Sequence, residues 1–195
     1  MRPAVFLDRD GTMIHDVGYL SRYEDVRWFG STIDAIRMMN RAGFLVLVTT
    51  NQSGIGRGLY TEAALQSIHE QMARHLEAGG AAVDGWFYCP HHPEAEIEAY
   101  RSVCSCRKPS PGMIRQAAGR FDIDLAQSFV IGDTPADLGA ATAAGARGIL
   151  VRTGSGESTM RSRPETAAEA AHVAPDLMAA TSWLLLQGGF PRATS

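Results

Sequence analysis

The sequence predicts an α/β protein in which one parallel sheet lies between two layers of helices. Short, continuously apolar segments alternate along the chain with amphipathic segments, and turn-forming residues separate them. Continuous apolar runs are typical of strands buried on both faces, and strand-helix alternation favours a parallel sheet with helices on both sides. We therefore expect a three-layer, Rossmann-like α/β/α architecture that forms a single domain over residues 1–195.

Each element of this sheet has its own signal in the sequence. Buried strands are predicted at residues 3–8, 44–50, 86–90, 127–133 and 147–153. Helices are predicted at residues 31–43, 61–80, 110–121, 134–145 and 176–187, because a cap residue opens most of these segments and glycine closes several of them. Residues 154–170 are rich in Gly, Ser and Glu, and we expect this segment and the tail 188–195 to be mobile.

The composition excludes several classes of partner. The chain is 45% hydrophobic and 20% charged, with a formal net charge of −3, so no global basic field attracts nucleic acid or an anionic membrane. The first apolar run, at residues 4–7, is too short for a signal peptide or a membrane span, and we expect a cytoplasmic protein. A small anionic ligand remains compatible with this composition.

Acidic and hydroxyl side chains follow three of the predicted strands. Asp8 and Asp10 come after the first strand, Thr50 after the second, and Asp133 after the fourth. Ligands of open α/β sheets bind at the carboxyl ends of the strands, so these side chains are expected at one edge. Two carboxylates at positions i and i+2 of an extended segment face the same way and favour a cation between them. Mg²⁺, which prefers oxygen ligands, is the natural candidate.

The segment Asp8-Arg9-Asp10-Gly11-Thr12 resembles the signature of the haloacid-dehalogenase-like (HAD-like) superfamily. The other expected pieces follow in order, and together they span residues 6 to 137: Thr50, Lys108, Gly132, Asp133 and Asp137. The resemblance implies a phosphatase in which Asp8 is the nucleophile and Asp10 the general acid and base. It also implies that Mg²⁺ is held by Asp8, the backbone carbonyl of Asp10, and Asp133. Thr50 and Lys108 would hold the phosphoryl oxygens. An aspartate rather than a serine at position 10 favours phosphate transfer over dehalogenation.

All three cysteines of the chain lie within residues 89–106. Cys89-x-His91 and Cys104-x-Cys106 supply four ligands, enough for a closed tetrahedral zinc site, and a closed site is structural because no position is left for water. His91 is preferred to His92 because it forms Cys-x-His. The zinc loop ends directly before Arg107 and Lys108, so zinc is expected to fix the loop that carries these two residues.

The glycine-rich segment 50–58 does not match a dinucleotide-binding fingerprint. Its glycines give G-x-G-x-G, one residue short of G-x-G-x-x-G, and the segment follows the second strand rather than the first. A turn around substrate oxygens fits better. Arg57 is then either a second anion contact or a solvated loop charge.

Within the superfamily, residues 4–154 resemble the D-glycero-D-manno-heptose 1,7-bisphosphate 7-phosphatases. That family implies a small phosphorylated sugar as the substrate, removal of its 7-phosphate through an aspartyl-phosphate, heptose biosynthesis, and no large cap domain. The implied substrate-binding residues are Asp16, Val17, Gly18, Tyr19, Thr50, Asn51, Gln52, Ser53, Arg57, Arg107, Lys108 and Thr134. Thr134-Pro135-Ala136 departs from the Lys-Leu-Glu-like sequence expected there.

Two other functions compete with this interpretation. The related histidinol-phosphatases share the aspartates and the zinc segment, but the twelve-residue spacer between His91 and Cys104 favours the heptose enzymes. A zinc-stabilised binding module, including a nucleic-acid binder, is disfavoured by the complete acid set at the strand ends. We expect a monomer without nucleic-acid or membrane partners. The sequence leaves open the anomer and whether the product serves lipopolysaccharide or a nucleotide-activated heptose.

Overall fold

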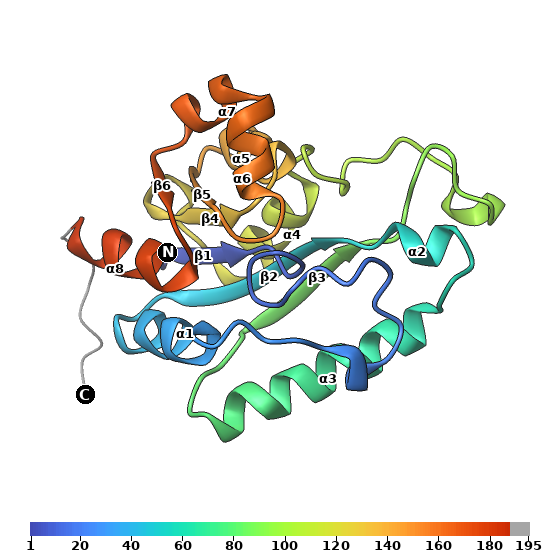
Figure 1. The fold of residues 1–195 in the computed structure, drawn as a ribbon, viewed down its shortest axis with the longest axis horizontal. Helices are drawn as coiled ribbons and strands as arrows, with labels where there is room; N and C mark the ends of the chain where they lie inside the picture. Colours follow the sequence, from blue (N-terminus) through green and yellow to red (C-terminus); the bar gives the residue numbers. More distant parts are fainter. Residues whose placement is uncertain (188–195) are drawn as a thin grey trace.

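The computed structural model describes residues 1–187 and contains a six-stranded parallel sheet between helices (Figure 1). The order of the strands across the sheet is β3-β2-β1-β4-β5-β6. The strands are β1 (Ala4–Leu7), β2 (Leu45–Asn51), β3 (Gly85–Cys89), β4 (Phe129–Gly132), β5 (Arg147–Val151) and β6 (His172–Ala174). All neighbouring pairs run parallel, which confirms the predicted α/β architecture.

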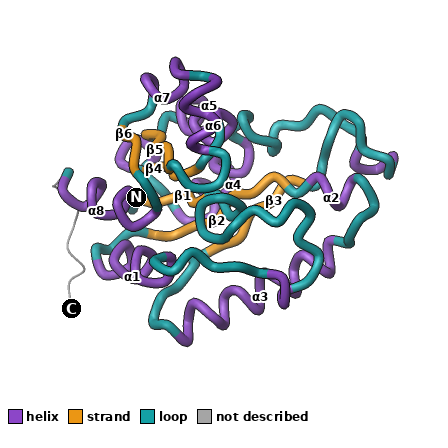
Figure 2. Tube along the Cα trace, in the orientation of Figure 1, coloured by secondary structure: helices purple, strands orange, loops and turns teal. Residues whose placement is uncertain are grey.

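Helices cover both faces of the sheet and complete the three layers (Figure 2). One face carries α1 (Thr32–Arg41), α3 (Glu62–Ala78) and α8 (Leu177–Leu186), and the other carries α4 (Gly112–Phe121) and α5 (Pro135–Ala144). Local signals set several of these boundaries. The Thr61 side chain accepts the Ala64 N–H at the start of α3, and Asp176 accepts the Ala179 N–H at the start of α8.

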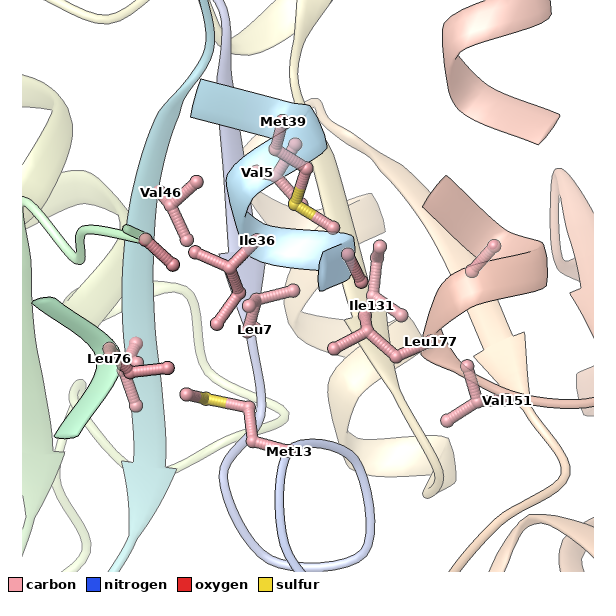
Figure 3. Packing of buried hydrophobic residues seen from close by; sticks show 14 of the residues in the cluster. Val5, Leu7, Met13, Ile36, Met39, Val46, Leu76, Ile131, Val151 and Leu177 are labelled. Atoms are coloured by element: carbon pink, nitrogen blue, oxygen red, sulfur yellow. The ribbon is translucent and has the colours of Figure 1, made fainter. Parts of the chain in front are cut away.

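Alternate side chains of the central strand β1 point to opposite faces of the sheet. Val5 and Leu7 pack with α1, α3 and α8, whereas Ala4 and Phe6 pack with α4 and α5. Figure 3 shows the first of these clusters, with Ile36 of α1 lying over the strands. The four β1 residues are fully buried, so the strand ends in a rigid position from which Asp8 and Asp10 emerge.

The strand order places two functional strand ends side by side. The chain proceeds from β1 outward through β2 to β3 and then returns to the other side of β1 at β4. Such a reversal opens a crevice beyond the carboxyl ends of the central strands. The Asp8 N–H donates to the Ile131 carbonyl over 2.9 Å, so the ends of β1 and β4 are joined directly. Asp8 and Asp133 therefore meet at this crevice.

Several segments differ from the sequence-based expectations. Two short helices, α6 (Gly156–Ser162) and α7 (Pro164–Glu169), and strand β6 form where no regular structure is predicted; mobility of residues 154–170 stays a prediction. The expected glycine-rich loop contains a one-turn helix, α2 (Ser53–Gly56). Helix α4 begins one residue later than expected, with Pro111 rather than Ser110 at the cap. The tail 188–195 lies outside the described residues.

No cap domain interrupts the described part of the chain. The connections 8–31 and 90–111 contain only the short turns η1 (Tyr23–Asp25) and η2 (Glu98–Tyr100), and a third turn, η3 (Leu125–Gln127), precedes β4. None of the described helices combines the length and the hydropathy needed to cross a membrane.

Candidate active site

Three buried carboxylates and one lysine meet at the carboxyl ends of the central strands. Asp8 follows β1, Asp133 follows β4, and Asp137 lies in the first turn of α5; one oxygen from each lies within 4.8 Å of the others. The Lys108 ammonium lies between Asp8 Oδ1, at 2.5 Å, and Asp137 Oδ1, at 2.6 Å. All four side chains are buried. Residues from separate segments thus lie together at one edge of the sheet.

The charge of Lys108 is fixed by its surroundings. Burial alone would lower its pKa, but Asp137 and Asp8 raise it above the usual lysine value, so the ammonium stays protonated. Its third partner is the Thr49 carbonyl, at 2.8 Å. The Lys108 backbone is held as well, because the Asn51 side chain accepts its N–H over 3.0 Å and donates to its carbonyl over 3.1 Å. The end of β2 thus positions a residue 57 places later in the chain.

The acidic centre carries more negative charge than Lys108 neutralises. When all three carboxylates are ionised, one ammonium leaves two negative charges uncompensated. Burial raises the pKa of Asp8 well above its usual value, and burial likewise raises the pKa of Asp133 to about 7. A divalent cation has the charge that this centre lacks, and carboxylate oxygens are its preferred ligands.

The surroundings of Asp133 leave one of its oxygens available. Oδ2 accepts the Ser155 N–H over 2.6 Å, whereas the buried Oδ1 has no hydrogen-bond partner. Gly11 and Gly154 border this carboxylate so closely that a Cβ on either would lie 2.3 Å from Oδ2. Thr153 donates its hydroxyl to the Gly11 carbonyl over 2.6 Å. The free Oδ1 and the glycine-lined space fit the predicted magnesium site.

Asp10 lines a small polar cavity beside the acidic centre. Gln52 Nε2 donates to Asp10 Oδ2 over 2.9 Å and to Thr50 Oγ1 over 2.8 Å. The cavity, of about 150 Å³, is bordered by Asp10, Asp16, Gly18, Tyr19, Asn51, Gln52, Ser53, Gly54 and Tyr60. The lining contains six of the twelve residues that the resemblance implies for substrate, and Thr50 contacts one of them, Gln52. Val17 lies in the same rim segment and is exposed.

The cysteine segment gathers four ligand atoms of the kind that zinc binds. The Sγ atoms of Cys89, Cys104 and Cys106 lie 2.9 to 3.5 Å apart, and His91 Nδ1 lies 3.3 Å from Cys106 Sγ. All four ligand atoms lie within 4.8 Å of one another. His92 is directed elsewhere, because its Nδ1 accepts the Glu94 N–H over 3.1 Å. The geometry fits a closed tetrahedral site built from Cys89, His91, Cys104 and Cys106.

The cysteine segment is also anchored to the substrate side of the sheet. The Ile97 N–H donates to the Gly56 carbonyl over 2.9 Å, which joins the segment to α2. The Tyr100 hydroxyl donates to Glu62 Oε1 over 2.6 Å, and the Tyr88 hydroxyl donates to the other oxygen of that carboxylate. These contacts join the loop to α2, which borders the polar cavity, and to the start of α3.

Four predicted substrate residues lie away from the small cavity: Lys108 in the acidic centre, and Arg107, Arg57 and Thr134. Arg107 donates to the His91 carbonyl over 3.2 Å and borders a larger cavity of about 540 Å³ together with Lys108 and zinc-loop residues. Arg57 directly follows α2, is absent from the lining of the small cavity, and has a buried Nε without a partner. Thr134 and Asp137 form a capping box at the start of α5, and the Thr134 hydroxyl also donates to Asp137 Oδ2 over 2.5 Å.

Sequence reasoning missed several contributors to this site. It left the role of Asp137 open, and it assigned no role to Tyr60, whose hydroxyl donates to Gln52 Oε1 over 2.6 Å. It also missed Ser155, which reaches Asp133 from a segment predicted to be mobile. The spacing of Thr134 and Asp137 is that of a capping box, which was the one available signal.

Comparison with known proteins shows relatives over most of the chain. A family model described as HAD-hydrolase-like matches residues 105–180. The D-glycero-beta-D-manno-heptose-1,7-bisphosphate 7-phosphatase of Escherichia coli (strain K12) is 45% identical over 153 residues, which cover 78% of this chain and 80% of that protein. The protein of the same name from Rhodopseudomonas palustris (strain ATCC BAA-98 / CGA009) is 44% identical over 148 residues, covering 76% and 82%.

Solved structures similar to this chain include two heptose bisphosphate phosphatases. The crystal structure of D,D-heptose 1,7-bisphosphate phosphatase from B. bronchiseptica, complexed with magnesium and phosphate, superposes with a TM-score of 0.84 at 37% identity and covers 96% of this chain and 100% of that one. The corresponding protein from Burkholderia thailandensis gives 0.69 at 33% identity, covering 94% and 99%. The chain therefore belongs to the heptose 1,7-bisphosphate 7-phosphatase family of HAD-like proteins.

Proposed function

We propose that this protein removes the 7-phosphate of D-glycero-β-D-manno-heptose 1,7-bisphosphate. The observation that carries the proposal is the buried contact of Asp8 with Lys108, opposite Asp133, at the crevice beyond β1 and β4. The relatives that are 43 to 45% identical are named for this reaction on the β anomer. Their names support the β anomer, a choice that the sequence leaves open.

In the proposed reaction Asp8 is the nucleophile. A carboxylate oxygen of Asp8 forms a bond to phosphorus while the bond from phosphorus to the sugar oxygen breaks, which gives an aspartyl-phosphate and, once the leaving oxygen has taken a proton, the sugar alcohol. Water then attacks phosphorus, which releases phosphate and regenerates the Asp8 carboxylate. Splitting one difficult hydrolysis into two displacements lowers the barrier of each.

Asp10 moves the protons in both displacements. Its carboxyl group gives a proton to the leaving sugar oxygen and later takes one from the attacking water, so it returns to its starting state. Lys108 and the Thr50 hydroxyl donate to the transferring phosphoryl oxygens. Because Lys108 is held by Asp137 and by Asn51, it is oriented before substrate arrives.

The proposed catalytic metal is Mg²⁺, bound by Asp8, the Asp10 backbone carbonyl and Asp133. When bound, it supplies positive charge that lets an anionic nucleophile approach an anionic phosphate. The excess negative charge of the centre and the free Asp133 Oδ1 support this assignment. A related protein, from B. bronchiseptica, has been crystallised with magnesium and phosphate.

Zinc is proposed as a structural ion bound by Cys89, His91, Cys104 and Cys106. These four residues fill a tetrahedral shell, which leaves no position for water and no chemical role in hydrolysis. A loop that zinc holds in place keeps Arg107 and Lys108 oriented toward the substrate, so little conformational entropy is lost when the substrate binds.

The proposed substrate contacts surround the small cavity and continue to the zinc loop. They comprise Asp16, Val17, Gly18, Tyr19, Thr50, Asn51, Gln52, Ser53, Arg107 and Lys108, with Arg57 and Thr134 at the margins. Most of these residues have side chains that can form hydrogen bonds, which suits a sugar with several hydroxyls. Histidinol phosphate has an imidazole instead, and it is the second candidate substrate because both kinds of enzyme share the aspartates and the zinc segment.

The test is a panel of phosphate esters that contains both anomers of heptose 1,7-bisphosphate and histidinol phosphate. We expect Mg²⁺-dependent phosphate release with the largest kcat/KM for the β anomer. Preference for histidinol phosphate would contradict the proposed substrate while leaving the phosphatase chemistry intact. We further propose a monomer in the cytoplasm, which size-exclusion chromatography with light scattering and cell fractionation would test.

A further inference from the structure

Arg9 is a fully buried arginine that the proposed reaction does not use. It lies between Asp8 and Asp10, and its accessible surface is 0%. A buried guanidinium needs a partner for its charge and acceptors for its five N–H groups, because it cannot lose its proton. The placement of those acceptors shows what Arg9 does.

Both sides of the Arg9 guanidinium are occupied. Nε and Nη2 approach both oxygens of Asp10 at 2.9 to 3.2 Å, and Nη1 lies 3.2 Å from His69 Nε2. Arginine can only donate, so His69 Nε2 is the acceptor and the ring proton is on Nδ1. Burial, followed by the charge of Arg9, lowers the pKa of His69 to about 3, so the ring is neutral and adds no second cation.

His69 is itself held in one orientation. It lies on α3, is 5% exposed, and stacks on Trp86 with ring centroids 4.6 Å apart. The edge of Tyr88 contacts the same ring, at a centroid distance of 6.4 Å. Since β3 supplies both aromatic rings, the position of the Nε2 lone pair is set by the packing of α3 on the sheet.

Asp10 is therefore fixed from two directions. Arg9 holds both of its oxygens, and Gln52 donates to Oδ2 over 2.9 Å. Gln52 cannot rotate freely, because the Tyr60 hydroxyl donates to its Oε1. Oδ2 thus accepts from two residues, whereas Oδ1 accepts from Arg9 alone, through Nε at 3.2 Å and Nη2 at 3.0 Å. The exposed part of the Asp10 side chain faces the small cavity.

We infer that Arg9 and His69 are positioning residues that orient the Asp10 carboxyl group for proton transfer to the leaving oxygen of the substrate. The chain of contacts runs from Trp86 through His69 and Arg9 to Asp10. Arg9 stays protonated throughout, so the proton that reaches the leaving oxygen comes from Asp10 alone. The inference rests on the proposed role of Asp10 and extends the catalytic machinery to the interior face of α3.

The test separates proton transfer from general loss of structure by varying the leaving group. A series of substituted phenyl phosphates differs in how much the departing oxygen needs a proton, and kcat/KM reports the steps up to aspartyl-phosphate formation. In Arg9→Lys the positive charge is kept, but the planar guanidinium that contacts both Asp10 oxygens is lost. We expect kcat/KM to fall about 100-fold for phenyl phosphate and less than about 5-fold for the ester of the most acidic nitrophenol, since general acid catalysis contributes on the order of 10²–10⁴-fold.

Variants of His69 repeat the test without touching Arg9. Gln keeps an acceptor near the position of Nε2, so His69→Gln is expected to retain the weak leaving-group dependence of the wild type, whereas His69→Leu steepens it. His75→Gln is the matched control, because His75 lies exposed on the same helix and stacks on Trp28. If Arg9→Lys does not fold, the comparison of the two His69 variants decides.

Three results would overturn the inference or its basis. Equal losses for every ester in Arg9→Lys and His69→Leu would show a merely structural role. The same leaving-group dependence in His69→Gln and His69→Leu would show that no hydrogen-bond acceptor is needed at position 69. The phenyl esters contain no heptose, so a wild type that cleaves them but not heptose bisphosphate would refute only the proposed substrate. A wild type inactive on all esters would overturn both proposals.

Discussion

The acidic centre and the Cys/His cluster lie at the same edge of the sheet, but they are built in different ways. The acidic centre is made at the ends of β1 and β4 and at the start of α5, so regular structure positions its carboxylates. Three of the four Cys/His ligands lie in a connection with almost no regular structure, between β3 and α4. The difference indicates that the fold creates the first site, whereas the second site must itself order the chain around it.

The largest effect is expected at the acidic centre. In Asp8→Asn the nucleophile is lost, and Mg²⁺-dependent phosphate release should fall by about 10⁴-fold or more. The fold and the zinc content should be unchanged, because Lys108 keeps its contact with Asp137. Asp34→Asn, on the exposed side of α1, is the control. Substantial phosphate release by Asp8→Asn would refute the nucleophile assignment.

A large effect on both stability and rate is expected in Asp137→Asn. This change removes one of the two carboxylates that hold the buried Lys108 ammonium and weakens the capping box with Thr134. We expect unfolding in urea to show a loss of about 1–3 kcal/mol. Misplacement of Lys108 should lower kcat/KM by about 100-fold. Unchanged stability would mean that Asp8 alone suffices to hold Lys108.

A change in the Cys/His cluster should affect stability and substrate binding more than the rate of the chemical step. We expect elemental analysis to find about one zinc per wild-type chain, as four ligands form one closed site. Cys104→Ser should lose that zinc, melt at a lower temperature and show a raised KM with a smaller change in kcat. Ser102→Ala changes an exposed residue of the same loop and is the control. Full zinc content in Cys104→Ser would remove Cys104 from the ligand set.

A pH dependence is expected from His69, which lies outside both sites. Its pKa is about 3 in the folded protein, against about 6.5 for a free histidine. Between these values the unfolded chain binds a proton that the folded protein does not, so stability falls as the pH falls below about 6.5. The slope is at most about 1.4 kcal/mol per pH unit.

Urea denaturation between pH 5 and 7.5 would test this dependence. His69→Gln has no such proton to bind, so its unfolding free energy should fall less steeply with acid than that of the wild type. His75→Gln should retain the wild-type slope. Parallel curves for wild type and His69→Gln would show that folding does not lower the pKa of His69.

The smallest effect is expected at Thr134. Its hydroxyl already donates to Asp137, and its side chain caps α5, so Thr134→Ala should cost about 1 kcal/mol of stability. Because that hydroxyl is engaged, KM should rise less than about 3-fold. A larger rise in KM would show that Thr134 contacts substrate directly.

The local parts of this architecture could be predicted from sequence. The buried strands, the helix caps at Thr61 and Asp176, and the carboxylates after β1 and β4 depend on patterns within a few residues. A parallel sheet then places all strand ends at one edge, so convergence of Asp8 and Asp133 follows from topology alone. The Cys/His ligands were predicted by their spacing and by resemblance to a family.

Contacts over long separations could not be predicted in this way. Arg9 and His69 are 60 residues apart, and only the packing of α3 on the sheet brings them together. The three-residue strand β6 is too short for a clear periodic signal. The contact of Ser155 with Asp133 comes from a Gly- and Ser-rich segment whose composition indicates a loop. These contacts are properties of the tertiary structure rather than of any local pattern.

Gly11 and Gly154 have a consequence for how this sequence can vary. They stand 143 positions apart in the chain, yet a Cβ at position 154 would lie 2.5 Å from the Gly11 Cα, and both residues have positive φ angles. A side chain at position 154 would push against backbone, which cannot move aside as a flexible side chain can. In a saturation library we expect every substitution at position 154 to be depleted. A single replacement there is not rescued by a change at position 11, where the smallest residue is already present.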